Sequence, residues 1–257
     1  MSELTYPEIF SLRGEVALIT GGGTGIGRDI ARSMHAAGAT VILTGRREAE
    51  LAATTKELGE RAAYFVHDVT QLDTAADLVA RVEQARGPIT CLVNNAGQNL
   101  KKPAVETSDA EFEAIFRTHV LGAHALTRAV APGMIQRGRG NVLFTASMAS
   151  LFGIPLVIAY TAAKAAYVGL VKGYATELSP HGVRVNAIAP GWIDTAMSRK
   201  AFAGDPARKE RILSRTPMRR LGDSSDIGWA AVYLASPAAN FVTGVILPVD
   251  GGVSIGF

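Results

Sequence analysis

The hydrophobic positions of the chain fall into short, almost continuous apolar runs that alternate with longer segments of helical periodicity. The apolar runs span residues 16–19, 41–43, 62–66, 89–93, 141–146, 183–188 and 245–249. Helical patterns fill the intervals, at residues 25–37, 47–58, 71–86, 109–136, 159–179 and 225–236. Runs that are apolar at nearly every position are typical of parallel strands buried on both faces. The alternation therefore predicts an α/β fold, with a doubly wound, mostly parallel sheet and helices on both faces.

No repeat, linker or change of composition divides the 257 residues, so we expect a single domain over residues 1–257. Residues 194–220 depart from the pattern, since they contain Gly204, Pro206, Pro217 and many basic residues. The segment follows the sixth predicted strand, at the carboxyl edge where such sheets bind ligands. We interpret it as a lid over a substrate. An ordinary pair of surface helices is the alternative.

Charge and cysteine content narrow the range of functions. The 26 Lys and Arg exceed the 23 Asp and Glu by only three and form no long run, which argues against nucleic acid as a partner. Cys91 is the only cysteine, which fits a reducing, cytoplasmic location. No basic region followed by an apolar stretch marks a signal peptide, and no run approaches about 18 apolar residues, so no membrane span is expected. The five histidines are scattered, and no metal site is predicted.

A glycine-rich turn joins the first apolar run to the first helical pattern. Residues 20–27 read TGGGTGIG, directly after the run 16–19. Strand, glycine turn and helix form the context of a dinucleotide-binding turn. Glycines let the backbone approach a pyrophosphate, and the helix N-terminus supplies unpaired N–H donors. The spacing is Gly-x-x-x-Gly-x-Gly rather than the commoner G-x-G-x-x-G, and a flexible turn without a ligand is the alternative.

A second signal combines a phenol, an ammonium and a hydroxyl. Lys164 follows Tyr160 by four residues, which places both on one face of a helix, and Ser147 precedes Tyr160 by thirteen. Two unit charges about 4 Å apart attract by ~4 kcal/mol at an effective dielectric of about 20. That attraction would lower the pKa of a phenol from ~10 toward ~7, the range that a general acid/base needs. A solvated aromatic beside a charge is the ordinary alternative.

Together these two signals resemble the short-chain dehydrogenase/reductase family. Further motifs match it: NNAG at residues 94–97, Ser147 ahead of Tyr160, Asn186 with Pro190 and Gly191, and VDGG at 249–252. The resemblance covers residues from about 12 to 252. It implies a Rossmann-type sheet of seven strands in the order 3-2-1-4-5-6-7 and an NAD(P)-dependent oxidoreductase that acts on a carbonyl or an alcohol.

The same resemblance assigns the cofactor contacts. They are Gly21, Gly23, Thr24, Gly25, Ile26, Gly27, Asp68, Val69, Asn95, Ala96, Gly97, Tyr160, Lys164, Pro190, Gly191, Ile193 and Thr195. Gly45 stands where NAD-preferring relatives carry an acid, and Arg46 follows it. Because arginine binds a phosphate in bidentate fashion, we predict NADP rather than NAD as the cofactor. The alternative is that Arg46 and Arg47 merely begin a surface helix.

By resemblance, Tyr160 is the general acid/base, Ser147 binds the substrate oxygen, and Lys164 lowers the pKa of Tyr160 and contacts the nicotinamide ribose. No G-x-S-x-G motif surrounds Ser147, which argues against a serine hydrolase. The family usually adds an asparagine in a V-N-x-x-G pattern, but residues 118–122 read THVLG and place His119 there. Three interpretations of His119 stay open. It is a buried imidazole with hydrogen-bond partners, a backbone carbonyl that holds a water near Lys164, or a proton relay that titrates near neutral pH.

The predicted function is the interconversion of a secondary alcohol and a ketone by hydride transfer (EC 1.1.1.-), on a small sugar acid, polyol or oxo compound. The predicted substrate contacts are Gln98, Met148, Trp192 and Met197. Residues 216–220 and 244–247 look like those of bacterial members that act on gluconate-like acids or 3-oxoacyl thioesters. Reduction of a 3-oxoacyl thioester is therefore one alternative, and a non-catalytic NADP-binding redox sensor is another, because His119 departs from the family pattern. Family members assemble through helices like those predicted at 109–136 and 159–179, so we expect a homotetramer.

Overall fold

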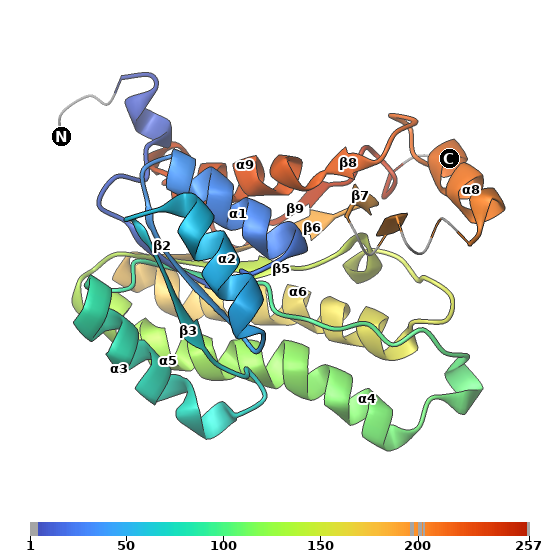
Figure 1. Cartoon of the computed structure of the whole chain (residues 1–257), viewed down its shortest axis with the longest axis horizontal. Helices are drawn as coiled ribbons and strands as arrows, with labels where there is room; N and C mark the ends of the chain where they lie inside the picture. Colours follow the sequence, from blue (N-terminus) through green and yellow to red (C-terminus); the bar gives the residue numbers. More distant parts are fainter. Residues whose placement is uncertain (1–4, 196–197, 200–201, 203, 256–257) are drawn as a thin grey trace.

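The computed structural model describes residues 5–195, 198–199, 202 and 204–255. Its centre is a sheet of seven parallel strands in the order β3-β2-β1-β4-β5-β6-β9 (Figure 1). The strands are β1 (Val16–Thr20), β2 (Thr40–Gly45), β3 (Ala62–Val66), β4 (Cys91–Asn94), β5 (Gly140–Thr145), β6 (Val183–Pro190) and β9 (Ile246–Val249). Each predicted apolar run overlaps one of them, which confirms the predicted fold class and strand order.

Helices cover both faces of this sheet and form a three-layer structure. One face carries α3 (Ala75–Arg86), α5 (Gly122–Gln136) and α6 (Ile158–Leu178) (Figure 1). The other face carries α1 (Gly25–Ala36), α2 (Glu48–Leu58) and α9 (Ser224–Ala235). The central strands are buried on both sides, so all five residues of β1 are buried. This arrangement explains why the strands read as continuous apolar runs.

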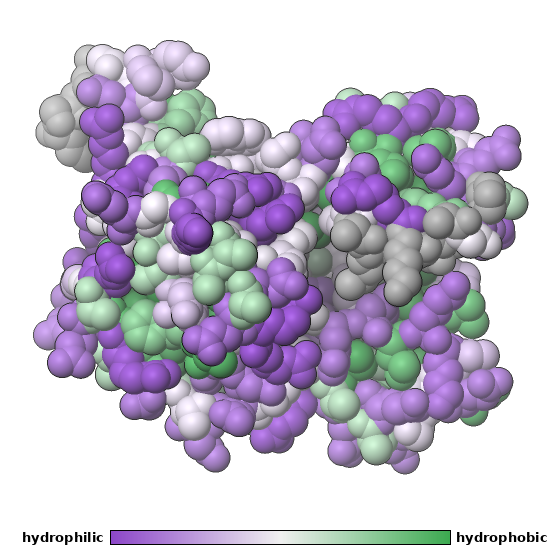
Figure 2. Space-filling model, in the orientation of Figure 1, coloured by the Kyte–Doolittle hydropathy of each residue, from purple (hydrophilic) through white to green (hydrophobic). Residues whose placement is uncertain are grey.

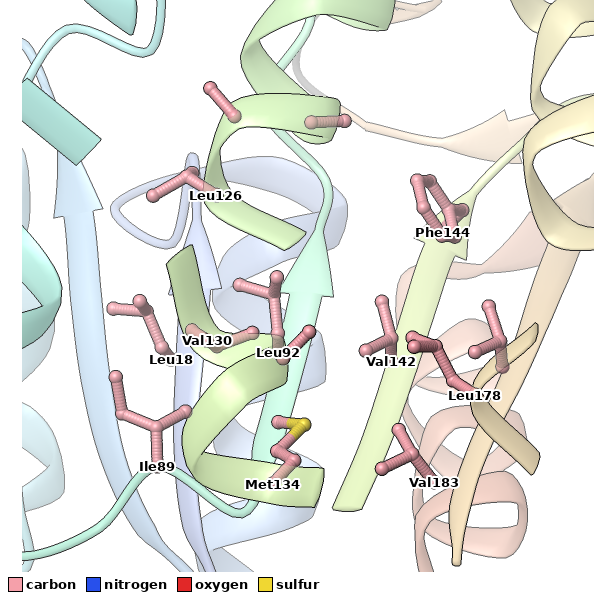
Figure 3. Close-up of a cluster of buried hydrophobic side chains, with 14 of the residues drawn as sticks. Leu18, Ile89, Leu92, Leu126, Val130, Met134, Val142, Phe144, Leu178 and Val183 are labelled. Carbon is pink, nitrogen blue, oxygen red and sulfur yellow. The ribbon is translucent and has the colours of Figure 1, made fainter. Parts of the chain in front are cut away.

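The core under α5 shows how the helical layer meets the sheet. Leu126, Val130 and Met134 recur at helical spacing along α5 and face the strands (Figure 3). They pack against strand residues that include Leu18 and Leu92, all of them at most 2% exposed. Burying an aliphatic side chain of this size stabilises the fold by about 1.5–3 kcal/mol. The stripe therefore fixes α5 on the sheet and, with it, the segment that precedes α5.

The helix predicted over residues 109–136 is interrupted, so that prediction is wrong in detail. It consists of α4 (Asp109–Phe116), a π-helical turn over Arg117–Leu121, and α5. A capping box of Ser108 and Glu111 begins α4. The wider π turn brings the helix close to a neighbouring loop, because a Cβ atom on Gly122 would lie 2.7 Å from the carbonyl oxygen of Val69. Such turns are frequent at functional sites, and His119 lies within this one.

The segment predicted as a lid, 194–220, lies between two short strands. They are β7 (Ile193–Asp194) and β8 (Gly222–Asp223), which pair in parallel. The described part between them includes α8 (Pro206–Arg215), at the end of the molecule farthest from the N-terminus (Figure 1). Figure 2 shows a recess on this side, between the surface over α1 and the surface over α8. Ile212 on α8 and Thr216 directly after it are buried.

None of the helices in the part of the chain that the structure describes has the length and apolarity that crossing a bilayer requires.

Candidate active site

Ser147, Tyr160 and Lys164 come together at the carboxyl end of β5. Ser147 lies two residues beyond this strand, and Tyr160 and Lys164 occupy successive turns near the start of α6. The hydroxyl of Ser147 lies close enough to that of Tyr160 to lower its pKa. The hydroxyl of Ser150 also donates to the carbonyl oxygen of Lys164 at 2.7 Å, which ties the loop after β5 to α6. The structure thus brings the three predicted catalytic side chains into one site.

Lys164 is buried without a carboxylate partner. Lys164 is only 3% exposed, and its Nζ donates a hydrogen bond of 2.6 Å to the carbonyl oxygen of Thr145. Among the described residues, no acidic oxygen lies within 4.0 Å of Nζ. Burial lowers the pKa of Lys164 to about 7. The ammonium is therefore held by neutral groups, and its charge is sensitive to pH.

The expectation that Lys164 brings the pKa of Tyr160 down toward neutrality is not met. Burial raises the pKa of Tyr160 above its ordinary value, and the nearby hydroxyl of Ser147 only partly opposes this. The Lys164 Nζ lies 5.6 Å from the centroid of the Tyr160 ring, and it is bonded to Thr145 instead. Tyr160 is half-buried, and the cost of charging its phenol away from water outweighs the contribution of Ser147.

His119 lies at the back of this site, at the π turn. It is 1% exposed, and its ring meets the Tyr160 ring edge-on with centroids 5.6 Å apart. Its Nε2 lies 3.1 Å from the backbone nitrogen of Gln98 and 2.8 Å from the Gln98 carbonyl oxygen, whereas Nδ1 has no hydrogen-bond partner. Its carbonyl oxygen accepts a 3.1 Å hydrogen bond from the hydroxyl of Tyr167. The interpretation as a buried, hydrogen-bonded imidazole therefore holds for one ring nitrogen.

A titration of His119 near neutral pH is not expected from this geometry. Burial, followed by the charge of Lys164, lowers the pKa of His119 to about 3, although the hydrogen bond with Gln98 acts in the opposite direction. The imidazole is therefore neutral over the usual working range of an enzyme. A relay through a protonated His119 does not fit this environment.

The glycine turn after β1 is shaped and locked by the loop after β4. Gly21 and Gly25 have φ of 67° and 55°, which glycine adopts without strain. A Cβ atom on Gly27 would lie 2.3 Å from the Gly21 carbonyl oxygen, so only glycine fits there. Asn95 binds this turn through Nδ2, which donates to the carbonyl oxygen of Thr20 at 2.9 Å. The hydroxyl of Thr20 in turn accepts from the backbone nitrogens of Asn95 and Ala96.

This turn fits a pyrophosphate. At Gly25, where α1 begins, the space that a Cβ would occupy has no atom within 4 Å. The N-cap residue Thr24 makes no side-chain hydrogen bond to the first N–H groups of α1. A helix N-terminus with an open approach is a site for anionic oxygen. Gly23, Thr24 and Ile26 line the same turn.

Two arginines lie where the second strand ends. Arg46 is exposed and, within the described part, makes no hydrogen bond or ion pair. Arg47, which was not among the predicted contacts, donates from Nη2 to the hydroxyl of Thr24 at 2.8 Å. In the sequence, the position of Arg47 directly after Arg46 was the feature that could have identified this contact. Burial raises the pKa of Asp68, but hydrogen bonds from Thr70 and the charge of Arg46 bring it below its usual value. Asp68 and Val69 thus lie at the same carboxyl edge, after β3.

The predicted contacts after β6 lie at the end of that strand. Pro190 is its last residue, and Gly191 follows in tight contact with the VDGG segment, because a Cβ there would lie 2.6 Å from the Cα of Asp250. Ile193 is buried in β7, and the backbone nitrogen of Thr195 donates to the Ser198 hydroxyl at 2.8 Å. Asn186 instead supports the sheet, since its Nδ2 donates to the carbonyl oxygen of Val242.

The predicted substrate contacts that the structure describes differ in burial and in distance along the chain from Ser147. Met148 is buried directly after Ser147, and Trp192 is half-buried beyond the end of β6. Gln98 is exposed, and its amide nitrogen donates to the hydroxyl of Thr118 in the π turn at 3.0 Å. Met197 lies outside the described residues. A separate pocket of about 480 Å³ on the lid segment includes Lys209, Leu213 and Arg219 in its lining and none of the three catalytic candidates.

Within the described ranges, no group of three or more His, Cys, Asp and Glu residues is arranged to hold a metal ion.

Comparisons with known proteins agree with this geometry. The family model described as enoyl-(acyl carrier protein) reductase matches residues 21–254. The chain is 37% identical over 255 residues to the gluconate 5-dehydrogenase of Gluconobacter oxydans, covering 98% of this chain and 99% of that protein. It is 40% identical over 255 residues to the L-tagatose-forming galactitol 2-dehydrogenase of Cereibacter sphaeroides, covering 98% of this chain and 100% of the relative.

A solved structure extends the likeness to three dimensions. The gluconate 5-dehydrogenase of Burkholderia cenocepacia, in complex with NADP and tartrate, superposes with a TM-score of 0.93 at 34% identity and covers 97% of this chain and 99% of its own. The match therefore spans the sheet, the glycine turn and the segment around α8 alike. On the strength of the matching family model and of relatives similar over almost their whole length, this chain belongs to the short-chain dehydrogenase/reductase family of oxidoreductases.

Proposed function

We propose that this protein is an NADP-preferring dehydrogenase that interconverts a secondary alcohol and a ketone on a small sugar acid or polyol, with Tyr160 as general acid/base. The observation that carries the proposal is the meeting of Ser147, Tyr160 and Lys164 at the carboxyl end of β5. Two neighbouring hydroxyls and a buried ammonium suit the transfer of a proton to or from a substrate oxygen. The names of the relatives support the choice of substrate class.

Tyr160 is the proton donor to the carbonyl oxygen in the reductive direction. Its raised pKa keeps the phenol protonated, which suits a general acid. In the oxidative direction the phenol must lose its proton, and a nearby positive charge then lowers the cost of the phenolate. Lys164, one helical turn on, supplies that charge when it is protonated. Alkaline solution favours loss of the phenol proton but also discharges Lys164, whose pKa is about 7, so the two effects oppose each other in the oxidative direction.

Ser147 orients the reacting oxygen. Its hydroxyl lies near that of Tyr160, whose pKa it lowers, and it accepts a 3.0 Å hydrogen bond from the backbone nitrogen of Ala149, which fixes its position. A second hydrogen bond to the substrate oxygen places that oxygen within reach of the phenol. Positioning of this kind contributes to rate by removing the entropy of orientation.

NADP fits the residues present at the carboxyl edge. The glycine turn with Gly21, Gly23 and Gly25 would hold the pyrophosphate, and Arg46 and Arg47 would hold a phosphate on the adenosine ribose. Asp68, Asn95 and Gly97 line the adenosine side. When bound, the nicotinamide accepts or delivers the hydride. Three solved relatives are crystal structures with NADP bound, which supports this choice of cofactor.

We further propose that the segment 194–220 acts as a lid and that the protein is a homotetramer in the cytoplasm. The position of α8 beside the recess in Figure 2 supports the lid. Exposed apolar side chains on the outer surface support assembly, among them Trp229 on α9 at 54% exposure and Phe241 at full exposure.

A substrate screen with both cofactors tests the function. Purified protein is incubated with NADPH or NADH and a panel of keto sugar acids, ketoses and 3-oxoacyl thioesters, and oxidation of the cofactor is followed by absorbance. We expect turnover with NADPH on a keto sugar acid or ketose. Turnover with 3-oxoacyl thioesters alone would show that these, and not sugar acids or polyols, are the substrate class. Tight NADPH binding with no turnover on any carbonyl would instead indicate a cofactor sensor.

A further inference from the structure

Tyr167 presents its ring to the Lys164 ammonium, and the mechanism above does not use it. The Lys164 Nζ lies 4.6 Å from the centroid of the Tyr167 ring, compared with 5.6 Å for Tyr160. Tyr167 is 1% exposed, so this contact is shielded from water. A cation over an aromatic face within about 6 Å is attracted to the ring, and the attraction grows when both groups are desolvated.

The Tyr167 ring is held in this orientation from both ends. Its hydroxyl donates to the carbonyl oxygen of His119 at 3.1 Å, in the π turn. Its ring packs against Phe144 of β5 with centroids 5.1 Å apart. Burial raises the pKa of the Tyr167 hydroxyl well above its usual range, so it stays protonated and acts only as a donor. The ring face is therefore fixed and available to the cation.

The surroundings of Lys164 leave few other sources of stabilisation for its charge. From α6 it faces Tyr160 and Tyr167, from the π turn the neutral His119, and from β5 the carbonyl oxygen of Thr145. None of these groups is an anion. The ring of Tyr167 and the carbonyl oxygen of Thr145 are therefore the groups on this side that oppose the cost of burying an ammonium.

We propose that Tyr167 is a positioning residue for Lys164, which holds the ammonium in its charged form and beside Tyr160 by a buried cation–π contact anchored on the backbone of His119. The contact and its effect on the charge of Lys164 are independent of the proposed function. Only the expected effect on the rate of turnover rests on that function. Tyr167 does not touch substrate or cofactor and acts through Lys164 alone. His119 thus serves the site by its carbonyl group as well as by its ring.

The test varies the electron density of the ring at position 167 while keeping its size nearly constant. Tyr167→Phe keeps the ring and removes the hydroxyl, and phenylalanines with one, two and three ring fluorines then weaken the negative ring face stepwise. Lys164 is observed by NMR in protein with ¹³C-labelled lysine, and its signal is assigned by its loss in Lys164→Met. We expect the midpoint of the Lys164 titration to fall with each fluorine, by about one pH unit over the series.

Tyr174 provides a matched control on the same helix. It lies seven residues after Tyr167, is half-buried, and stacks on His124 rather than on a lysine. The same substitutions there should leave the Lys164 titration unchanged. A titration that stays constant across the fluorinated series at position 167 would overturn the proposal. Tyr167→Leu, which removes the ring altogether, should give the largest fall, and the fluorinated series answers the question even if that variant does not fold.

Turnover separates this inference from the proposed function. If Lys164 must be charged for the reductive reaction, the alkaline limb of the pH profile of kcat moves to lower pH in step with the NMR titration. A moving NMR titration with a fixed kinetic limb supports the contact and counts against the assigned role of Lys164 in turnover. A fixed NMR titration counts against the contact whatever the activity is.

Discussion

Gly97 and His119 fit against each other so closely that a Cβ atom on Gly97 would lie 2.3 Å from Cε1 of the His119 ring. The two residues come from different segments, the loop after β4 and the π turn before α5. The imidazole has little room to move, because its Nε2 lies against the Gln98 backbone and its ring meets Tyr160. His119, which stands where the family usually has an asparagine, thus fits because Gly97 has no side chain.

This fit predicts a strong coupling between the two positions. Gly97→Ala should lower the free energy of unfolding by about 1–3 kcal/mol, because an added methyl group overpacks the ring. In a His119→Ala background the same change should cost far less, with a coupling energy of about 1–3 kcal/mol in a double-mutant cycle measured by denaturant unfolding. Gly153→Ala is the control, since a Cβ there meets no atom within 4 Å. Additive effects of the two changes would contradict the fit.

Replacing the phenol tests the acid/base assignment. Tyr160→Phe keeps the ring beside His119 and removes the hydroxyl that lies near Ser147. Loss of a general acid lowers kcat by about 10²–10⁴-fold. The affinity for NADPH, measured by fluorescence titration, should change little, because the hydroxyl serves the reacting oxygen. Wild-type kcat in this variant would falsify the assignment.

The buried Lys164 makes stability depend on pH. Its folded pKa of about 7 lies below that of an unfolded lysine, so between pH ~7 and ~10 the unfolded chain binds the extra proton. The free energy of unfolding from this residue therefore rises as pH rises through that window. Lys164→Met should be more stable than wild type at pH 7, and the difference should shrink toward pH 10. Equilibrium unfolding at several pH values measures this, and an equal difference at all of them would speak against a depressed pKa.

His119 should be dispensable as a titrating group. Its pKa of about 3 keeps the imidazole neutral at the pH of an assay. Its carbonyl oxygen, which receives the Tyr167 hydroxyl, is present whatever the side chain is. We expect His119→Asn to retain turnover comparable to wild type, with no limb lost from its pH profile near neutrality. Collapse of kcat to background would show that the imidazole has an essential role of its own.

Cofactor choice should depend on the arginines at the end of β2. Arg46→Ala should raise the KM for NADPH about tenfold or more while leaving that for NADH nearly unchanged, because bidentate phosphate binding is lost. Arg47→Ala should act similarly but also loosen Thr24, to which it is bonded. Arg139→Ala removes the same charge next to β5 at the opposite edge of the sheet and is the control. An equal loss with both cofactors would point to a structural role for Arg46.

Much of the fold was readable from the sequence. Each strand of the sheet is apolar at consecutive positions because it is covered on both faces, so its place in the chain is a local property. The π turn was not readable, because the residues around His119 have the same helical periodicity as α4 and α5. The widening there depends on contacts such as that of Gly122 with Val69, which lie far apart in the chain.

By itself the sequence determined the alternation of strands and helices, the glycine turn, and the residue types of the site, since spacing and side-chain chemistry are written in the chain. Tertiary structure alone decided how these groups behave. It placed Tyr167 under the Lys164 ammonium, bonded that ammonium to Thr145, and raised rather than lowered the pKa of Tyr160. The physical reason is that pKa values and cation–π contacts depend on burial and on distances between segments that meet only when the helices pack on the sheet.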